Sequence, residues 1–169
     1  MPPADPLFRI RPGRSDDAPP LTRLLNEIIA AGGTTAMEEA LTEDGFAAYF
    51  LTGPDVLCCH VAELNATGEP VGFQAVCHYP DLPAGWGDIA TFARRAPKLP
   101  GIGASLFPRT VAAARSRSLI AINAAIRADN TGGLAYYDKM GFRTYRTLAA
   151  VPLRDGTPVD RILKRYDLA

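Results

Sequence analysis

The chain has 169 residues, of which 47% are hydrophobic and 21% charged, the usual balance of a globular protein. This length predicts one domain, residues 1–169, that is large enough to bury a core of its own. The 18 lysines and arginines balance the 18 aspartates and glutamates. We therefore expect neither a nucleic acid nor an anionic membrane as partner, because such partners usually require a basic surface.

The composition also argues against secretion and metal binding. The N-terminus lacks the basic flank and apolar core of a secretory signal, and the apolar runs are too short to cross a bilayer. We therefore expect a cytoplasmic protein. Its three cysteines form no Cys-x-x-Cys pair and lie in apolar runs, which favours buried, reduced thiols. The two histidines have no third ligand in sight, so no metal is expected.

The first third of the chain predicts a strand and two helices. Apolar and basic residues alternate from Leu7 to Arg11, which is typical of a strand with one solvated face. A helix should begin at Ser15 and end at Gly32-Gly33, because apolar residues keep helical spacing between them. Thr42 is placed to cap a second helix, whose expected apolar face is Phe46, Tyr49 and Phe50.

The rest of the chain predicts three strands, a helix, a strand, a helix and two strands. Residues 56–64 and 71–79 are strand-like runs separated by turn residues, which indicates a β-hairpin. The other elements are expected at 86–93, 105–117, 119–126, just after Asn130, 142–147 and 159–166. This order predicts an α+β fold, a mixed sheet with helices packed on it. Pro108 should cost its helix a hydrogen bond or kink it.

A glycine-bearing turn, Lys98 to Ala104, lies between a predicted strand and a predicted helix. Backbone N–H groups at a helix start lack partners and the helix dipole is positive there, so such a turn can bind a phosphate. Gly101 and Gly103 would leave no side chain in the way, and Lys98 adds positive charge. The turn lacks the third glycine of the dinucleotide fingerprint, and the chain has no P-loop. An ordinary structural turn is the other interpretation.

This turn resembles the pyrophosphate-binding loop of the GNAT superfamily of N-acetyltransferases. A second block, Asn130 to Phe142, resembles the other conserved motif of that family and follows the first by about thirty residues. The matching residues are Asn130, Tyr137, Lys139, Gly141 and Phe142. The opening of the first helix, Asn26-Glu27 and the Gly-Thr-Thr segment are closest in outline to the phosphinothricin and amino-acid N-acetyltransferases.

The resemblance implies the acetyltransferase fold, a mostly antiparallel sheet in which the strands at 88–93 and 119–126 splay apart. A β-bulge in the earlier strand commonly helps to open the gap. Acetyl-CoA is implied as co-substrate, with its pantetheine arm in that gap and no metal. The residues expected to contact it are Phe92, Ala93, Lys98, Leu99, Gly101, Ile102, Gly103, Ala104, Asn130, Gly133, Tyr137 and Lys139.

The resemblance also implies catalytic and acceptor residues. Tyr137 would be the general acid, because a phenol with a pKa of about 10 is protonated at neutral pH and can protonate a departing thiolate. Asp88 would be the general base. Glu27, Thr34 and Thr35 lie where relatives build the acceptor pocket. Plainer interpretations stay open for all five: a core tyrosine, a strand-end aspartate, and exposed helix-end or loop residues.

Two other interpretations concern the second motif. Asn130 could cap the short helix or bind the pantetheine arm. Gly132 and Gly133 are poor helix formers, and their presence suggests a close backbone approach by another group, the cofactor being one candidate.

Together these features predict an acetyl-CoA-dependent N-acetyltransferase that acts on the primary amine of a small amino-acid-like acceptor by direct attack. A non-catalytic acyl-CoA sensor of the same fold is an alternative, because Lys98 replaces the usual Arg or Gln and Pro100 removes a backbone N–H. An acetyltransferase of protein N-termini or lysines is another. A homodimer is expected by analogy only.

Overall fold

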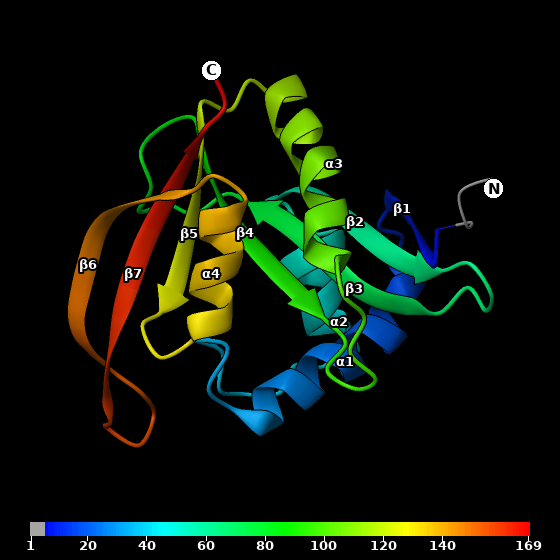
Figure 1. The fold of residues 1–169 in the computed structure, drawn as a ribbon, viewed down its shortest axis with the longest axis horizontal. Helices are drawn as coiled ribbons and strands as arrows, with labels where there is room; N and C mark the ends of the chain where they lie inside the picture. Colours follow the sequence, from blue (N-terminus) through cyan, green and yellow to red (C-terminus); the bar gives the residue numbers. More distant parts are fainter. Residues whose placement is uncertain (1–5) are drawn as a thin grey trace.

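The computed structural model describes residues 6–169, and one seven-stranded sheet forms its centre (Figure 1). The strand order is β1-β2-β3-β4-β5-β7-β6. All neighbours are antiparallel except β4 and β5, which run parallel. The strands are β1 (Phe8–Pro12), β2 (Val56–Leu64), β3 (Pro70–Cys77), β4 (Trp86–Ala93), β5 (Ala121–Arg127), β6 (Arg143–Pro152) and β7 (Pro158–Asp167). The predicted α+β class, with a mixed, mostly antiparallel sheet, is confirmed.

Helices cover both faces of this sheet (Figure 1). Helices α1 and α2 pack on one face, where they share a core with β2 and β3. Helices α3 and α4 pack on the other face, α3 mainly against β2 and β3 and α4 against β5. None of the helices in the described chain is long and apolar enough to span a membrane. The helices are η1 (Ser15–Asp17), α1 (Ala18–Ala31), α2 (Glu43–Phe46), η2 (Ala47–Leu51), α3 (Ile102–Ser116) and α4 (Thr131–Lys139).

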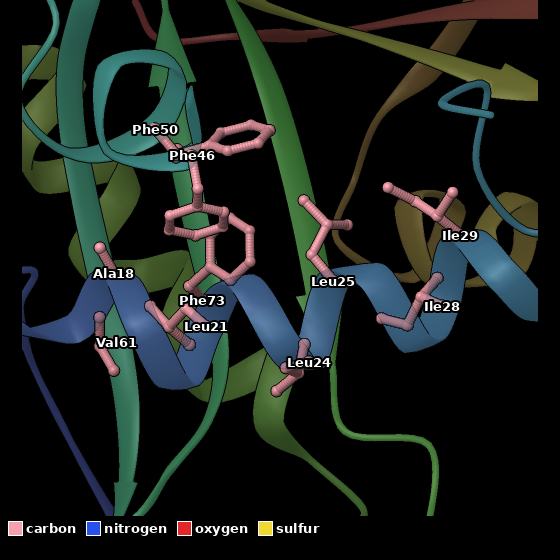
Figure 2. Packing of buried hydrophobic residues seen from close by; sticks show 11 residues of the cluster. Ala18, Leu21, Leu24, Leu25, Ile28, Ile29, Phe46, Phe50, Val61 and Phe73 are labelled. Carbon is pink, nitrogen blue, oxygen red and sulfur yellow. The ribbon is translucent and has the colours of Figure 1, made fainter. Parts of the chain in front are cut away.

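The apolar face of α1 lies on a cluster of aromatic rings, as Figure 2 shows. The rings of Phe46 and Phe73 meet edge to face with centroids 5.1 Å apart, and Thr42 caps α2 as predicted by accepting a bond from the Gly45 N–H at 3.0 Å. The assignment of Tyr49 to the buried face is wrong, because that side chain is 56% exposed. Residues 47–51 form a wider π-turn, which rotates Tyr49 out of line with Phe46.

Most expected elements lie where the sequence placed them, but two of them have different ends. Helix α3 begins at Ile102, three residues earlier than expected, and continues past the exposed Pro108 to Ser116. Strand β6 continues to Pro152, five residues further than expected, because it is an edge strand whose mostly exposed side chains give no apolar alternation. The three cysteines are free, and they are half-buried rather than fully buried.

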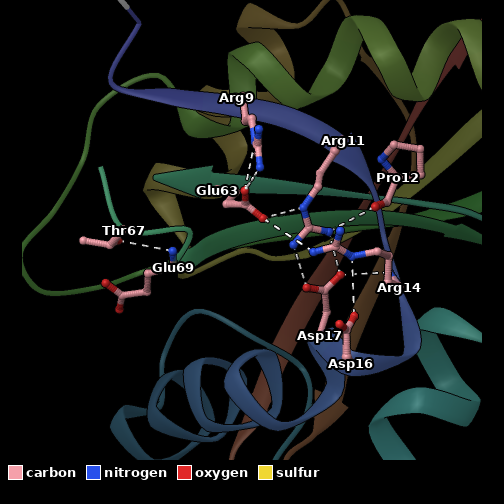
Figure 3. A network of polar contacts seen from close by, with 9 residues as sticks. All are labelled: Arg9, Arg11, Pro12, Arg14, Asp16, Asp17, Glu63, Thr67 and Glu69. Atoms are coloured by element: carbon pink, nitrogen blue, oxygen red, sulfur yellow. Dashed lines mark hydrogen bonds and ion pairs between the residues drawn. The ribbon is translucent and has the colours of Figure 1, made fainter. Parts of the chain in front are cut away.

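The polar face of β1 is solvated at Arg9, as expected, because that side chain is 64% exposed, but Arg11 on the same face is largely buried between carboxylates (Figure 3). The Arg11 guanidinium is 13% exposed and lies between two carboxylates. Its Nη1 and Nη2 atoms donate to Asp17 at 2.8 and 2.7 Å, and its Nε donates to Glu63 at 2.5 Å. Arg9 donates to the other Glu63 oxygen at 2.8 Å. These bonds join η1 to β1 and β2.

Strands β4 and β5 separate in the middle of the sheet. They pair at three positions only, and the last pair joins Asp88 to Asn123. The predicted splay is therefore confirmed. No β-bulge accompanies it in the β3–β4 ladder, which is unbroken from Gly72–Ala93 to Cys77–Asp88. The gap consequently begins at Asp88 and widens along a regular β4.

Candidate active site

The turn after β4 ends at the start of α3, and this start is open. Gly101 forms the N-cap in the left-handed region, with φ +85°, and no side chain caps the helix. The first bond of the helix runs from the Ser105 N–H to the Gly101 carbonyl at 3.0 Å. The N–H groups of Ile102, Gly103 and Ala104 therefore precede the helical ladder and point out of its positive end. This arrangement suits a phosphate.

The two glycines of this turn have different structural roles. A Cβ at Gly101 would meet nothing within 4 Å, but the positive φ would strain any other residue. A Cβ at Gly103 would lie 2.6 Å from a ring carbon of Tyr136. The Tyr136 hydroxyl also donates to the Gly103 carbonyl at 2.9 Å. The Tyr136 ring therefore requires a glycine at position 103, whatever binds at the Gly103 N–H.

A cavity of about 350 Å³ lies beside this turn, between the end of β4 and the start of α4. Five of the predicted cofactor residues line it, together with the predicted acceptor residue Thr34. Arg94 and Arg95 also line it, and the sequence reasoning missed both, although two consecutive arginines next to the turn were a usable signal. The lining residues are Ile28, Thr34, Thr91, Phe92, Ala93, Arg94, Arg95, Lys98, Leu99 and Asn130.

Asn130 joins two segments that are far apart in the sequence. Its Oδ1 accepts the Gly133 N–H at 2.9 Å and so caps α4, and its Nδ2 donates to the Thr34 carbonyl at 3.0 Å. A Cβ at Gly133 would lie 2.4 Å from Asn130 Nδ2. The close approach expected at Gly133 is therefore made by the Asn130 side chain. Of the two roles considered for Asn130, the helix cap is the one that the contacts show.

Tyr137 lies on the buried face of α4 and is only 7% exposed. Its hydroxyl oxygen lies 3.0 Å from Oγ1 of Thr91, a residue that lines the cavity. Burial raises the pKa of Tyr137, so the phenol stays protonated well above neutral pH. Lys139 is exposed at the far end of α4 and does not line the cavity, so the structure does not bring it to the other predicted cofactor residues.

Asp88 lies where β4 and β5 part. Asn123 Nδ2 donates to Asp88 Oδ1 at 2.7 Å, and the Tyr145 hydroxyl donates to Asn123 Oδ1 at 2.5 Å. Burial raises the pKa of Asp88 to about 6. Because side chains alternate along a strand, Asp88 shares the α1 side of β4 with Phe92, whereas Thr91 faces α4. Asp88 and Tyr137 thus lie on opposite faces of β4.

The three predicted acceptor residues have different surroundings. Glu27 is exposed on α1 and does not line the cavity. Thr35 is 8% exposed and makes structural contacts: its Oγ1 accepts the Met37 N–H at 3.1 Å and its carbonyl accepts from Arg127 at 3.3 Å. Only Thr34 lies at the cavity. Within residues 6–169, no cluster of three or more His, Cys, Asp or Glu side chains could hold a metal.

No protein-family model matches the sequence, and no curated protein is significantly similar to it. Solved structures are similar over nearly the whole chain. An N-acetyltransferase from Staphylococcus aureus Mu50 is 21% identical, with a TM-score of 0.84 over 96% of this chain and 99% of that one. A GNAT superfamily phosphinothricin acetyltransferase from Sinorhizobium meliloti, solved in complex with AcCoA, is 16% identical, with a TM-score of 0.83 over 97% and 90%.

A third similar structure is a ribosomal-protein-alanine N-acetyltransferase from Brucella melitensis. It is 20% identical, with a TM-score of 0.81 over 94% of this chain and 99% of that one. At such identities the likeness concerns the fold. The chain therefore has the fold of the GNAT N-acetyltransferases, and phosphinothricin acetyltransferases are among the proteins that share it.

Proposed function

We propose that the protein is an acetyl-CoA-dependent N-acetyltransferase, and that its acceptor is the primary amine of a small amino-acid-like compound. One observation carries the proposal. In a chain with the GNAT fold, the gap between β4 and β5 has an open helix start at one end and Asp88 at the other, and the Tyr137 hydroxyl lies between them, 3.0 Å from Thr91 Oγ1 on β4. No covalent acyl-enzyme is needed, because the amine can attack the thioester directly.

The residues around the gap fit coenzyme A. The N–H groups at the start of α3 would hold its diphosphate, and the nearby Arg94, Arg95 and Lys98 side chains would balance the negative charge. The pantetheine arm would lie along Phe92 and Ala93, in the gap where the edge of β4 has no strand beside it. The acetyl-CoA complex of the Sinorhizobium meliloti enzyme supports this assignment.

The chemistry follows from the two faces of β4. The Asp88 carboxylate, with a pKa of about 6, is largely ionised at neutral pH and would take a proton from the ammonium group of the acceptor, which leaves the free amine to attack. On the other face, the protonated Tyr137 hydroxyl would give a proton to the sulfur as the C–S bond breaks. The acceptor would therefore enter from the α1 side, where Thr34 and Glu27 lie.

One alternative function is acetylation of proteins. A small acceptor is supported by the fold shared with phosphinothricin acetyltransferases, but the Brucella melitensis protein with the same fold is named for a ribosomal protein. The other alternative is an acyl-CoA sensor, which would use the same cavity without turnover.

We also propose a cytoplasmic location and a homodimer, and the homodimer can be tested by sedimentation of the purified protein.

The test combines thermal stability with CoA release. Acetyl-CoA at 100 times its Kd should stabilise the folded protein by about 2.7 kcal/mol, and free CoA should form with some members of a panel of amino acids, other amines and N-terminal peptides. Stabilisation without release from any acceptor would favour the sensor. A lack of stabilisation at saturating acetyl-CoA would overturn the proposal.

Two variants of α3 provide a matched control for this binding test. Ala104 and Ala112 are both exposed on the same helix, but only Ala104 lies in its first turn. Ala104→Glu would place a carboxylate at the proposed diphosphate site, whereas Ala112→Glu makes the same change of charge two turns away. Acetyl-CoA should stabilise Ala112→Glu as it does the unmodified protein and should stabilise Ala104→Glu much less.

A further inference from the structure

Four polar side chains form a connected chain of hydrogen bonds beneath the gap. Gln74 on β3 is completely buried, and its Nε2 lies 3.0 Å from the Tyr136 hydroxyl and 2.9 Å from Thr91 Oγ1. Thr91 Oγ1 in turn lies 3.0 Å from the Tyr137 hydroxyl. The chain of bonds thus connects the start of α3, through β3 and β4, to the proposed general acid.

One end of this chain fixes its direction. The Gly103 carbonyl can only accept, so the single hydroxyl hydrogen of Tyr136 is directed to it at 2.9 Å. The Tyr136 oxygen must then accept from Gln74, which requires the amide nitrogen of Gln74, and not its oxygen, to face Tyr136. The orientation of the Gln74 amide is therefore determined by the helix start of α3.

The orientation of the Gln74 amide determines which atom donates in each remaining hydrogen bond, up to Tyr137. With its amide so oriented, Gln74 donates its second N–H hydrogen to Thr91 Oγ1. Thr91 has one hydrogen of its own, and the Tyr137 oxygen is its acceptor within the described residues. The Tyr137 hydroxyl therefore receives a hydrogen bond from Thr91, which lines the cavity, and its own hydrogen is left without an acceptor among residues 6–169.

The Gln74 amide is costly to keep. Its Oε1 is buried and has no partner among residues 6–169. A buried acceptor without a partner costs about 1–3 kcal/mol, and an apolar side chain at this position would avoid the cost. The two N–H donors of Gln74 are what the site gains from this residue.

We propose that Gln74 and Thr91 are positioning residues that direct the Tyr137 hydroxyl, so that Tyr137 holds its proton ready for the departing sulfur. The inference rests on the proposed function. In the step concerned, the C–S bond breaks, the sulfur keeps the bonding electron pair and takes the Tyr137 proton. The nitrogen loses two protons in all, one to Asp88 before the attack and one to solvent as the amide forms. Asp88 and Tyr137 then recover their starting states by exchange with solvent, so each turnover releases one proton.

The test is a set of variants of Thr91 and Gln74. Thr91→Val removes the hydroxyl at nearly constant volume, Thr91→Ser keeps it, and Gln74→Met removes both N–H donors. Thr91→Val and Gln74→Met should each lower kcat about 10-fold or more while the KM for acetyl-CoA changes less than about 3-fold, since an oriented general acid contributes about 10²–10⁴-fold in total. Thr91→Ser should restore most of the rate.

A matched control and a double variant separate positioning from packing. Thr110 is also completely buried, but it donates only to the Leu106 carbonyl of its own helix at 3.4 Å. Thr110→Val should therefore lower the melting temperature without changing kcat. In a Tyr137→Phe background, Thr91→Val should have no further effect on kcat, because Thr91 acts through Tyr137.

The outcomes distinguish this inference from the proposed function. If Tyr137→Phe lowers kcat but Thr91→Val and Gln74→Met do not, or if the effects of Thr91→Val and Tyr137→Phe multiply, the positioning role is overturned and the general acid stands. If the unmodified protein releases no CoA, the proposed function itself fails. Should Thr91→Val not fold, as judged by its circular dichroism, Gln74→Met and Thr91→Ser decide the question.

Discussion

Asp88 is subject to two opposing influences on its ionisation. Burial raises its pKa and the hydrogen bond from Asn123 lowers it, with burial the larger, so that the result is about 6. Because a general base must be ionised, we expect kcat/KM to rise with pH through an apparent pKa near 6. Asp88→Asn should lower turnover about 10²-fold and remove this acid limb from the pH–rate profile. An unchanged limb in the variant would assign it to another group.

The same ionisation has a predictable effect on stability. The pKa of Asp88 is raised above its ordinary 3.8 by folding, so its stabilising contribution is present below about pH 4 and is lost as the pH rises through about 6. At pH 7 the ionised, buried carboxylate therefore destabilises the fold. Asp88→Asn should be more stable than the unmodified protein at pH 7, by up to about 3 kcal/mol, and the difference should shrink at pH 4. Melting curves of both proteins at the two pH values would measure it.

Tyr137 is expected to be essential for rate but not for binding or folding. Tyr137→Phe should lower kcat about 10²-fold or more. The phenyl ring would keep its edge-to-face contacts with Tyr136 and Phe142, at centroid distances of 4.9 and 5.0 Å. Stabilisation by acetyl-CoA should persist. A well-folded variant with an unchanged rate would remove Tyr137 from the mechanism.

At the scale of the elements, the carboxylate that joins β1 to β2 offers a test of stability. Glu63 accepts from Arg11 and Arg9, and these bonds hold its pKa below the usual range. Its contribution is therefore present above about pH 4.5 and is lost as the pH falls further. Glu63→Gln should lower the free energy of unfolding at pH 7 by about 2 kcal/mol, and the loss should diminish in acid.

A surface ion pair in the same region provides the control for this measurement. Asp16 lies 3.4 Å from Arg14, and both side chains are more than half exposed. Asp16→Asn removes one carboxylate charge, as Glu63→Gln does, but should change stability by less than about 0.5 kcal/mol. Denaturant unfolding of the two variants at pH 7 would compare them. Equal effects would mean that the burial of Glu63 contributes nothing.

The sequence predicts the elements better than it predicts their surroundings. Periodicity locates the strands and helices because burial acts locally along the chain. It does not reveal that Tyr49 points outward, because the same apolar residues can form an α-turn or a π-turn, and only the π-turn rotates Tyr49 out of line with Phe46. It also does not reveal the contact of Gly103 with Tyr136, because the ring that requires this glycine lies 33 residues later in the chain. The bond between Asn130 and Thr34, 96 residues apart, is likewise invisible to spacing.

Most of the candidate site could be predicted from two motifs, because the helix start and the block at Asn130 are each continuous in sequence. Gln74 and Thr91 could not, since each is an ordinary strand residue until the fold brings it to Tyr137. The predicted homodimer and the organisation as one domain stay predictions.

At the scale of the whole molecule, hydrogen bonds between segments far apart in the sequence join the two sides of the gap. One of them is the bond from Asn130 to the Thr34 carbonyl, and another is the bond from Arg127 to the Thr35 carbonyl. Asn130→Ala should lose the helix cap and one of these connections, at a cost of about 1 kcal/mol or more. Because a ligand in the gap would contact both sides, saturating acetyl-CoA should recover part of the loss. Thermal melting with and without acetyl-CoA would show it, and Asn130→Asp, which keeps the cap only, separates the two contributions.

The length of unpaired β4 also sets a distance. Five residue steps separate Asp88, where pairing with β5 stops, from Ala93, where the turn toward α3 begins. At 3.3 Å per residue, this unpaired part of β4 is about 17 Å long. A ligand anchored by its phosphates at the turn can react beside Asp88 only if its reactive group lies about that far from them. Each further residue pair between β4 and β5 would shorten the unpaired part of β4 by one residue. The extent of pairing between the two strands therefore selects the length of the molecule that the protein can use.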